Sequence, residues 1–411
     1  MIRAALLDAA RAAPDPAGLS ALRLSLLDWA AVAIAGADEP VAVAARSLAT
    51  APGPCAVVGG ALAIPAQAAL ANGAAGHALD YDDTHFDHIG HVSTVVVPAA
   101  LAAAQAEGAG WDAFERAALA GAEAAIRMGA WLGRAHYQTG FHQTGTSGAF
   151  GACVAAAGIV GLDDRALGDA LGLTATRAAG LKSQFGTMGK PLNAGFAAQA
   201  GLEAAMLARA GATSAEGALD GPQGFGPTHA GEGAPIPDSP RFHAVRHKLH
   251  ACCHGLHAAL EALAALGPVD GPVTVVTHPR WLRVCAIPAP RTGLEAKFSY
   301  AHALALRLAG HDTAALDTFS DALANDPAVV ALRDRVTVET DDALPDTAAI
   351  VRADGREVRH DLLNPVPDAP ARVAAKARAL VGDRADVIAR AVADGDLAAY
   401  ASALRTSSAS A

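Results

Sequence analysis

Between residues 16 and 214 the chain consists of long segments with helical character, separated by short breaks rich in glycine and proline. These segments are dominated by alanine, leucine and glycine, and many are apolar on most faces. Alanine favours a helix because it loses no side-chain entropy there, and a helix that is apolar on most faces packs inside other helices. Helices are predicted at 99–107, 111–132, 149–160, 164–173 and 194–210. The region therefore predicts a large all-helical domain.

The character of the chain changes after a stretch rich in glycine and proline at residues 217–240. Residues 271–278 and 336–340 have the composition of strands, and Asp354-Gly355 between two β-prone runs at 348–360 predicts a hairpin. Further helices are expected at 258–266, 299–309, 313–325 and 369–405. The predicted fold is mainly α: an all-helical domain of residues 1–240, rejoined by about 370–411, and a smaller α+β domain of residues 241–369.

Composition narrows the classes of partner and location. The net charge of −10 argues against nucleic acid, because phosphate binding requires a basic face, although a small acidic substrate stays open. The five cysteines match no zinc-binding spacing and are expected to be reduced. Residues 1–19 carry charges that a signal peptide lacks, and apolar stretches such as 29–37 are short for a bilayer. We expect a soluble, cytoplasmic protein with no membrane partner.

The densest chemistry lies in GHALDYDDTHFDHIGHVSTVVVPAAL, residues 76–101, which concentrates aspartate, histidine and threonine. One interpretation is a helix end with solvated acids, and a second is a metal site of His85, His88 and His91. The third is an acid–base site in which an aspartate orients a histidine that transfers protons near neutral pH. Gly90 breaks any helix that would give the three histidines a regular spacing, so no metal is predicted.

Two segments suit the binding of an anion. In residues 140–152, His142 precedes a helix start with Thr144, Thr146 and Ser147, where free backbone N–H groups can bind an anion or simply be capped. Lys190 lies at a glycine-rich helix entrance in residues 184–195, where it could hold a carboxylate or be an ordinary surface lysine. Either feature alone is weak.

Two later segments add further basic groups. Residues 246–257 are rich in histidine, and a helix would place four side chains on one face, as a ligand site or as a solvated face: His250, Cys253, His254 and His257. Lys297 precedes a helix that begins near Ser299 and carries His302. Together the segments supply Asp, Thr, His and Lys without a nucleophile elbow or a dinucleotide fingerprint. Such a set suits proton abstraction and return on a polycarboxylate.

Six motifs follow one another along the chain: NGAAGHALDYDDTH (72–85), GHVSTVVVPAALAAA (90–104), FHQTGTSGAFGA (141–152), FGTMGKPLNAGFAAQAGLEAAMLARAG (185–211), KLHACCHGLHAALEAL (248–263) and GLEAKFS (293–299). In order and spacing they resemble the MmgE/PrpD family over nearly the whole chain. Members of that family dehydrate 2-methylcitrate, decarboxylate cis-aconitate or epimerise iminodisuccinate. The resemblance implies a helical domain plus an α+β domain, a basic active site between them, a homodimer and no cofactor.

The resemblance also implies catalytic residues, position by position. The Asp and Thr of the family's DxDDT segment fall on Asp80 and Thr84, and the further catalytic positions fall on His91, His142, Lys190 and His257. The chain departs from common family patterns in having HVS instead of HPS after residue 90 and HQT instead of HPT after residue 141. After KFS, His302 replaces the tyrosine of KFSLPY-type members. These departures leave the substrate open.

The reactions of the family share negative charge that develops next to a carboxylate, and catalysis requires that this charge be held better than the ground state. Lys190 and His257 are expected to hold it, while Asp80 orients a histidine or takes the proton and His91 or His142 returns a proton. The expected substrate-binding residues are Thr84, Thr144, Arg291, Lys297 and His302. The six motif residues are expected to converge on one locally basic site.

The first hypothesis is a cofactor-independent hydro-lyase that acts on a small di- or tricarboxylate such as a citrate-like acid. An epimerase or a decarboxylase that acts on a related acid is the alternative among enzymes. A non-catalytic carboxylate-binding member of the family is the alternative from another class.

Overall fold

The structure is a computed structural model that describes residues 1–405, so residues 406–411 of the expected C-terminal segment lie outside the described residues. The chain divides into two compact units, Lys248–Leu380 and the remainder on either side of it. The first boundary follows residue 247 because the preceding segment is tied to the first unit. Thr84 and Arg246 exchange backbone hydrogen bonds of 2.8 Å, and the backbone N–H groups of Arg241 and Phe242 donate to the buried Glu123 carboxylate.

The first unit is helical, with no strand among its described residues, which confirms the predicted fold class for this part of the chain. Its helices are α1 (Ile2–Arg11), α2 (Pro16–Ala35), α3 (Pro40–Arg46), α4 (Pro65–His77), α5 (Ser93–Glu107), α6 (Trp111–Thr139), α7 (Gln143–Val160), α8 (Asp164–Ala175), α9 (Gly189–Arg209), α10 (Phe225–Thr228), α17 (Arg384–Asp394) and α18 (Leu397–Arg405), with short 3₁₀ turns η1 (Lys182–Gln184) and η2 (Phe242–Ala244).

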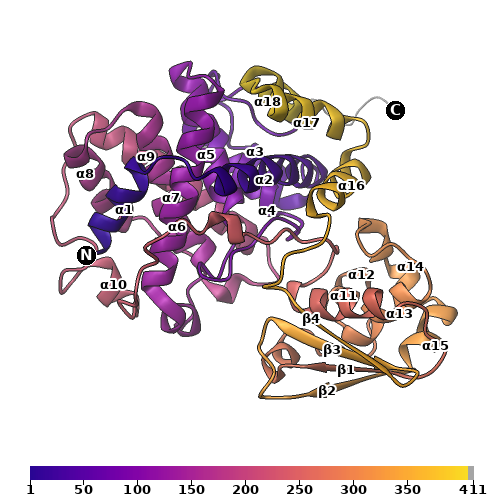
Figure 1. The fold of residues 1–411 in the computed structure, drawn as a ribbon. Coiled ribbons are helices and arrows are strands. Elements are labelled where there is room, and N and C mark those ends of the chain that lie inside the picture. The colour runs from indigo at the N-terminus through magenta and orange to yellow at the C-terminus, as the bar shows by residue number, and fades with distance from the viewer. Residues whose placement is uncertain (406–411) are drawn as a thin grey trace. The chain divides into compact units, whose positions relative to one another are not determined.

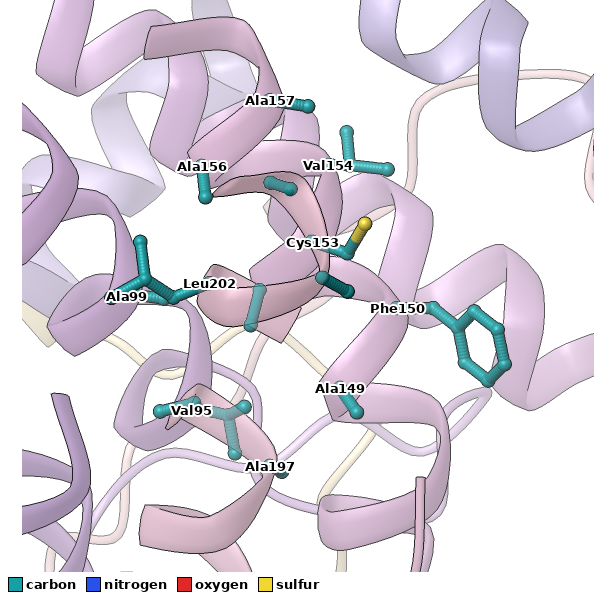
Figure 2. Packing of buried hydrophobic residues seen from close by; sticks show 14 of the residues in the cluster. Val95, Ala99, Ala149, Phe150, Cys153, Val154, Ala156, Ala157, Ala197 and Leu202 are labelled. Carbon is teal, nitrogen blue, oxygen red and sulfur yellow. The ribbon is translucent and has the colours of Figure 1, made fainter. Parts of the chain in front are cut away.

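The core of this unit forms where α4, α5, α7 and α9 pack together, and small side chains let the helices approach closely. Figure 2 shows Val95 and Ala99 of α5, Ala149 and Cys153 of α7 and Leu202 of α9 within this core. At Gly195 of α9 an added Cβ atom would lie 2.4 Å from the carbonyl oxygen of Leu70 in α4, so only glycine permits this distance. The close packing fixes α4, α5, α7 and α9, whose ends carry the site described below.

Helix α2 changes one sequence expectation. The sequence stretch at 29–37 was judged too short to cross a membrane, but the whole helix is long and apolar enough to do so by length and composition. Most of its residues are buried in this unit, where it packs on α4 and α17 and where the Tyr400 hydroxyl of α18 donates to the Leu26 carbonyl at 2.9 Å. These contacts are those of a core helix.

The expected single helix over 369–405 is wrong. Its span contains three helices, α16 (Ala369–Val381), α17 and α18. Gly382 and Gly395 separate them with φ angles of 59° and 66°, the left-handed conformation that ends a helix. Helices α17 and α18 both contact α2, so the C-terminal part of the chain packs on the first unit.

The second unit combines helices with a four-stranded sheet of order β2-β1-β3-β4 (Figure 1). The strands are β1 (Val273–Thr277), β2 (Val336–Thr340), β3 (Ala348–Ala353) and β4 (Arg356–Asp361), and the helices are α11 (His257–Leu266), α12 (Gly293–Ala296), α13 (Tyr300–Leu308), α14 (Asp321–Ala324), α15 (Pro327–Arg333) and α16. Strand β1 is parallel to β2 and antiparallel to β3. Asp354 and Gly355 both have positive φ in the predicted hairpin turn, and α11 packs on β3 and β4.

The helix predicted at residues 313–325 of this unit is wrong, and the helical spacing considered for residues 246–257 is formed only in part. Residues 313–325 contain only the 3₁₀ turn η5 (Leu316–Thr318) and the short α14, because Ser320 caps a new helix start there and Asp326 caps α15 directly after it. The histidine-rich segment 246–253 is not helical either, since helical structure begins only at the 3₁₀ turn η3 (His254–Leu256).

Candidate active site

The loop of residues 78–92 joins α4 to α5 and holds most of the candidate site. Asp80 has a φ of +50°, a conformation that aspartate tolerates better than most residues, and its N–H donates to the His77 carbonyl at 3.1 Å. His85 and Gly90 pair by backbone hydrogen bonds and close a tight turn. An added Cβ atom at Gly90 would lie 2.8 Å from the Thr144 nitrogen, so glycine lets this loop rest on the start of α7.

His91 follows this turn and is held from three sides. Its backbone N–H donates to Thr144 Oγ1 at 3.0 Å. Its ring nitrogen Nδ1 lies 3.0 Å from Asp82 Oδ2, and Nε2 lies 3.4 Å from Asp80 Oδ1. The imidazole is nearly buried and therefore has one preferred orientation, with Nε2 directed at Asp80.

Lys190 approaches the same oxygen of Asp80 from α9. Its Nζ lies 2.7 Å from Asp80 Oδ1 and 5.3 Å from the centre of the Phe185 ring. A lysine in the first turn of a helix is opposed by the helix dipole, and the Asp80 carboxylate offsets this. Asp80 is the most exposed member of the group, with 37% of its side chain accessible, so solvent reaches the site at this ion pair.

Asp82 lies beneath His91, fully buried, and joins it to a second histidine. His77, the last residue of α4, places Nδ1 at 2.9 and 3.1 Å from the two oxygens of Asp82. Burial alone would raise the pKa of Asp82, but the imidazoles of His77 and His91 outweigh it and hold that pKa well below its usual value. Asp82 is thus an ionised carboxylate shared by two rings.

His142 completes the group from the residue before α7. Its ring stacks on His77 with the centres 5.9 Å apart, and Phe185 contacts it edge-on at 4.9 Å. The Asn193 side-chain amide of α9 lies 3.1 Å from His142 Nδ1 and can donate to it, which leaves Nε2 as the protonated nitrogen. Burial, followed by the nearby His77 and Lys190, lowers the pKa of His142 well below the usual value, so this imidazole is neutral.

A further buried carboxylate, Asp83, lies next to this group. Ser93 at the start of α5 donates to it twice, from its N–H at 3.1 Å and its hydroxyl at 2.5 Å. Burial raises the pKa of Asp83 to about 6, against the lowering effect of the Ser93 and Ser25 hydrogen bonds. No arginine or lysine contributes to this shift, in contrast to the Asp80–Lys190 pair.

The anion-binding interpretation of the α7 start is corrected by these contacts. Thr144, expected to bind substrate, is fully buried and accepts the His91 N–H, so it positions His91 instead. Thr146 bonds to His136 Nε2 at 2.8 Å, and the Ser147 hydroxyl donates to the Gln143 carbonyl at 2.8 Å. The loop at Gly90 covers the start of α7, so the hydroxyl groups of this helix start form hydrogen bonds inside the protein. Thr84 contributes its backbone to the bridge with Arg246, and its expected role with substrate stays a prediction.

The alternative metal site of His85, His88 and His91 is also not formed. His85 Nε2 is directed at the Arg241 carbonyl at 2.9 Å, and His88 Nδ1 at the Ala125 carbonyl at 3.1 Å. Burial lowers the pKa of His88 to about 3, so it is a neutral, internal histidine. The two rings therefore hold separate backbone segments in place.

A different set of donors, His77, Asp80, Asp82 and His91, is compact enough to surround a cation, since one atom of each lies within 4.8 Å of all the others. The contacts nevertheless fit a hydrogen-bonded network better. Each Nδ1 atom is at hydrogen-bond distance from Asp82, and the Lys190 ammonium already neutralises Asp80. A metal would have to displace both Nδ1 protons and lie beside that ammonium.

His257, expected to hold negative charge, lies in the second unit, where its side chain is almost fully buried. Its Nε2 lies 3.3 Å from the Cys252 carbonyl, and its ring lies between those of His250 and His254, at 5.0 and 4.7 Å. Burial, then the neighbouring His254 and His250, lowers the pKa of His257 well below the usual value. The neutral ring faces this carbonyl through Nε2, and the role expected for His257 stays a prediction.

The other predicted residues of the second unit differ in their surroundings. His302 on α13 is fully buried, and Arg333 of α15 and the backbone at Leu323 of α14 are among the groups that affect its pKa. Burial lowers that pKa to about 4, and the ring belongs to the interior between these helices, so its assignment to substrate binding is corrected. Arg291 is exposed and Lys297 is partly exposed, and their roles stay predictions.

Sequence reasoning thus found Asp80, His91, His142 and Lys190, which the structure brings together, and it missed His77, Asp82 and Asn193. His77 and Asp82 are five positions apart and belong to the same motif as Asp80. Their pairing depends on the chain reversing at the end of α4, which the residue types do not reveal. The cluster of the first unit is also not strongly basic, because Asp80 and Asp82 oppose Lys190 and the histidines.

Comparison with known proteins finds matches to two family domains and to several curated relatives. Residues 7–235 match the MmgE/PrpD N-terminal domain, and residues 250–390 match the MmgE/PrpD C-terminal domain. The chain is 35% identical over 207 residues to a cis-aconitate decarboxylase of Aspergillus terreus, which covers 47% of this chain and 42% of that protein. It is 33% identical over 172 residues to a human cis-aconitate decarboxylase, covering 40% of this chain and 35% of that protein.

The matched region thus spans less than half of the length of these curated relatives. The two domain matches, in contrast, account for most of the chain, in the order and at the positions that the two structural units occupy. The resemblance seen in the sequence motifs is confirmed: the chain belongs to the MmgE/PrpD family.

Proposed function

We propose that the protein is a cofactor-independent lyase that acts on a small di- or tricarboxylate through proton transfer at the carbon next to a carboxylate. One observation carries this proposal. His91 Nε2 and Lys190 Nζ lie 3.4 and 2.7 Å from the same oxygen, Asp80 Oδ1. An anionic oxygen is therefore stable at a point between a proton-transfer group and a fixed ammonium.

The chemistry of such a lyase requires this combination. When a bond next to a carboxylate breaks heterolytically, its electron pair spreads over the carboxylate oxygens, and an ammonium that faces them lowers the barrier. In the proposed reaction the substrate carboxylate takes the place of the Asp80 oxygen beside Lys190. His91, oriented by Asp82, then exchanges a proton with the adjacent carbon.

Two reactions fit these groups. In a dehydration, His91 removes a proton from carbon and returns it to the leaving hydroxyl group, which departs as water. In a decarboxylation, the electron pair of the departing carboxylate stays on carbon and His91 delivers a proton to it. The names of the two relatives favour the decarboxylation of a cis-aconitate-like acid as the second candidate, next to the hydro-lyase reaction expected from the motifs.

Proton NMR in D₂O tests both candidates directly. The protein is mixed in turn with citrate, 2-methylcitrate, cis-aconitate and iminodisuccinate, and the carbon-bound protons are followed over time. We expect one acid to lose water or carbon dioxide, with deuterium incorporated next to a carboxylate. Deuterium exchange without a net product would indicate an epimerase, and thermal stabilisation by an acid without any exchange would indicate a binding protein; either outcome contradicts the proposal.

Lysine variants provide the matched comparison. Lys190→Ala is expected to lower kcat/KM by 10²-fold or more, on the order of the loss of one preorganised electrostatic group. Lys182→Ala is the control, because Lys182 also lies over an aromatic ring, Tyr137, at 3.7 Å but donates to the Tyr137 carbonyl at 3.0 Å instead of a carboxylate. Equal losses in the two variants would contradict the role of Lys190.

A further inference from the structure

Asp82 contacts two histidines, although a contact with His91 alone would be enough to orient that ring. His77 Nδ1 contacts both oxygens of Asp82, while His91 Nδ1 contacts Oδ2. An ionised carboxylate only accepts hydrogen bonds, so each Nδ1 that faces it carries a proton. The lone pair or second proton of each ring is therefore at Nε2, and for His91 that atom is directed at Asp80 and Lys190.

The second histidine has no route to a substrate. His77 Nε2 is buried and has no hydrogen-bond partner, and the side chain of His77 has no exposed surface. The His77 ring lies against His91, with the ring centres 4.3 Å apart, and against His142. His77 can thus influence the reaction only through its neighbours, and a buried polar atom without a partner is costly enough to require a reason.

Charge balance supplies that reason. One buried carboxylate can compensate one imidazolium, whereas two charged rings in edge contact repel each other. His77 and His91 therefore share a single counter-charge, Asp82. The other titratable or charged groups that face His91 come from the loop, α7 and α9: Asp80, His88, His142 and Lys190.

We propose that His77 and Asp82 are positioning residues that together set how readily His91 takes up a proton. Asp82 fixes the Nδ1–H form of His91 and favours its protonation, and His77 weakens that effect by drawing on the same carboxylate. The inference rests on the proposed function, in which His91 transfers the proton. It predicts opposite consequences for the loss of Asp82 and the loss of His77, whereas a merely structural role predicts the same kind of damage from both.

The variants are chosen to separate the two effects. Asp82→Asn removes the charge and keeps the shape, so the pH at which His91 is half-protonated should fall by about 1 to 3 pH units. His77→Asn keeps a hydrogen-bond donor near the position of Nδ1 but cannot take up a proton, so the same midpoint should rise. His250→Asn is the matched control, because His250 also contacts a carboxylate, Glu261, at 2.9 Å, and it should leave the midpoint unchanged.

The midpoint is measured in two ways on the full-length chain. NMR titration of protein labelled at histidine Cε1, with the His91 signal assigned through His91→Gln, reports protonation without any need for activity. The pH dependence of kcat/KM reports the same group during turnover. We expect opposite shifts in the two variants by both methods, and a fall in kcat with little change in KM, since Lys190 is untouched.

The two methods keep the inference apart from the proposed function. If the NMR midpoints of His91 shift in opposite directions but the pH dependence of kcat/KM does not shift with them, the coupling of His77 and Asp82 to His91 stands and the role of His91 in catalysis is overturned. Midpoints that shift in the same direction in both variants, or do not shift, would overturn the inference itself. Should Asp82→Asn fail to fold, the upward shift in His77→Asn alone decides, because a structural role gives no reason for a higher midpoint.

Discussion

Two histidine–carboxylate groups, one in each unit, differ in what balances the carboxylate. In the second unit, Glu261 of α11 accepts hydrogen bonds from His250 Nε2 at 2.9 Å and from both terminal nitrogens of Arg372, at 2.5 and 3.0 Å. His250 Nδ1 lies 2.7 Å from the Thr313 hydroxyl, so both nitrogens of that ring are occupied. In the first unit, Asp82 is balanced by histidines alone, and His77 Nε2 has no partner.

The difference separates a structural group from a reactive one. An arginine keeps its charge at every accessible pH, so the Glu261 group has one stable charge state. An imidazole carries no permanent charge, so the positive charge beside Asp82 is not fixed. Proximity of a histidine to a carboxylate therefore does not by itself indicate catalysis; the two groups differ in whether the positive charge beside the carboxylate is permanent.

The largest expected effect tests this distinction on activity. His91→Gln should lower kcat by about 10²- to 10⁴-fold, the usual contribution of a general acid–base group. His250→Gln should leave kcat nearly unchanged, because His250 belongs to the group with the fixed counter-charge. Initial rates with the substrate identified by NMR measure both. Comparable losses of kcat in the two variants, at equal folded fraction by circular dichroism, would remove the distinction.

Asp83 allows a test by protein stability, because it is a buried carboxylate with no arginine or lysine among the groups that shift its pKa. Its folded pKa of about 6 lies above the usual value of 3.8. A raised folded pKa means that its contribution to stability is fully present below about pH 3.8 and is lost as the pH rises through 6. The loss amounts to about 3 kcal/mol, as an order of magnitude.

The variant Asp83→Asn isolates this contribution, since an amide can still pair with the Ser93 hydroxyl and accept from the Ser93 N–H. We expect the free energy of unfolding of the variant, minus that of the unchanged protein, to be about 2 kcal/mol higher at pH 7.5 than at pH 4. Urea unfolding at both pH values provides the measurement. A difference that is independent of pH would show that Asp83 titrates normally in the folded protein.

Glu261 should show the opposite sign and a smaller effect. Burial opposes it, but the hydrogen bonds from His250 and Arg372 lower the pKa of Glu261 below its usual value. A lowered folded pKa gives stability that is present above about pH 4.5 and is lost as the pH falls. Because the Arg372 side chain is one-third exposed, we expect Glu261→Gln to cost only about 1–2 kcal/mol at neutral pH, and less in acid. Urea unfolding at pH 7.5 and pH 4 tests the direction; a cost that grows in acid would contradict it.

Much of the fold was predictable because apolar helices and a turn such as Asp354-Gly355 are local features. The predicted starts of α5, α7 and α9 were late, at residues 99, 149 and 194 instead of Ser93, Gln143 and Gly189. The missed first turns contain valine, glycine, threonine and proline, which favour helices weakly, and they form because they are buried and hydrogen-bonded. The same turns hold Ser93, Thr144 and Lys190, so local preference fails where the site begins.

Only those residues of the candidate site that occupy recognisable motif positions could be predicted from the sequence. Asp80, His91, His142 and Lys190 follow from the motifs. The pairing of His77 with Asp82 and of Asn193 with His142 depends on how α4 ends and how α7 packs on α9. His257 was assigned from its motif position and His302 from its place on the helix that follows Lys297. Burial lowers the pKa of both rings, which the sequence alone does not reveal.

The smallest expected effect is that of metal removal, which tests whether the first-unit group is one of hydrogen bonds. His77, Asp80, Asp82 and His91 offer a donor set that Zn²⁺ accepts, and their proximity alone does not exclude an ion. Lys190 decides against it, since its ammonium lies 2.7 Å from Asp80 Oδ1 and would repel a divalent cation held by the same carboxylate. We therefore expect exhaustive dialysis against EDTA to leave kcat and KM unchanged, and elemental analysis to find no stoichiometric transition metal. The opposite result would be that EDTA abolishes activity, that one divalent metal restores it, and that Asp82→Asn has neither the activity nor the metal. In that case both carboxylates would be balanced by a permanent positive charge, and the two groups would not differ in this respect.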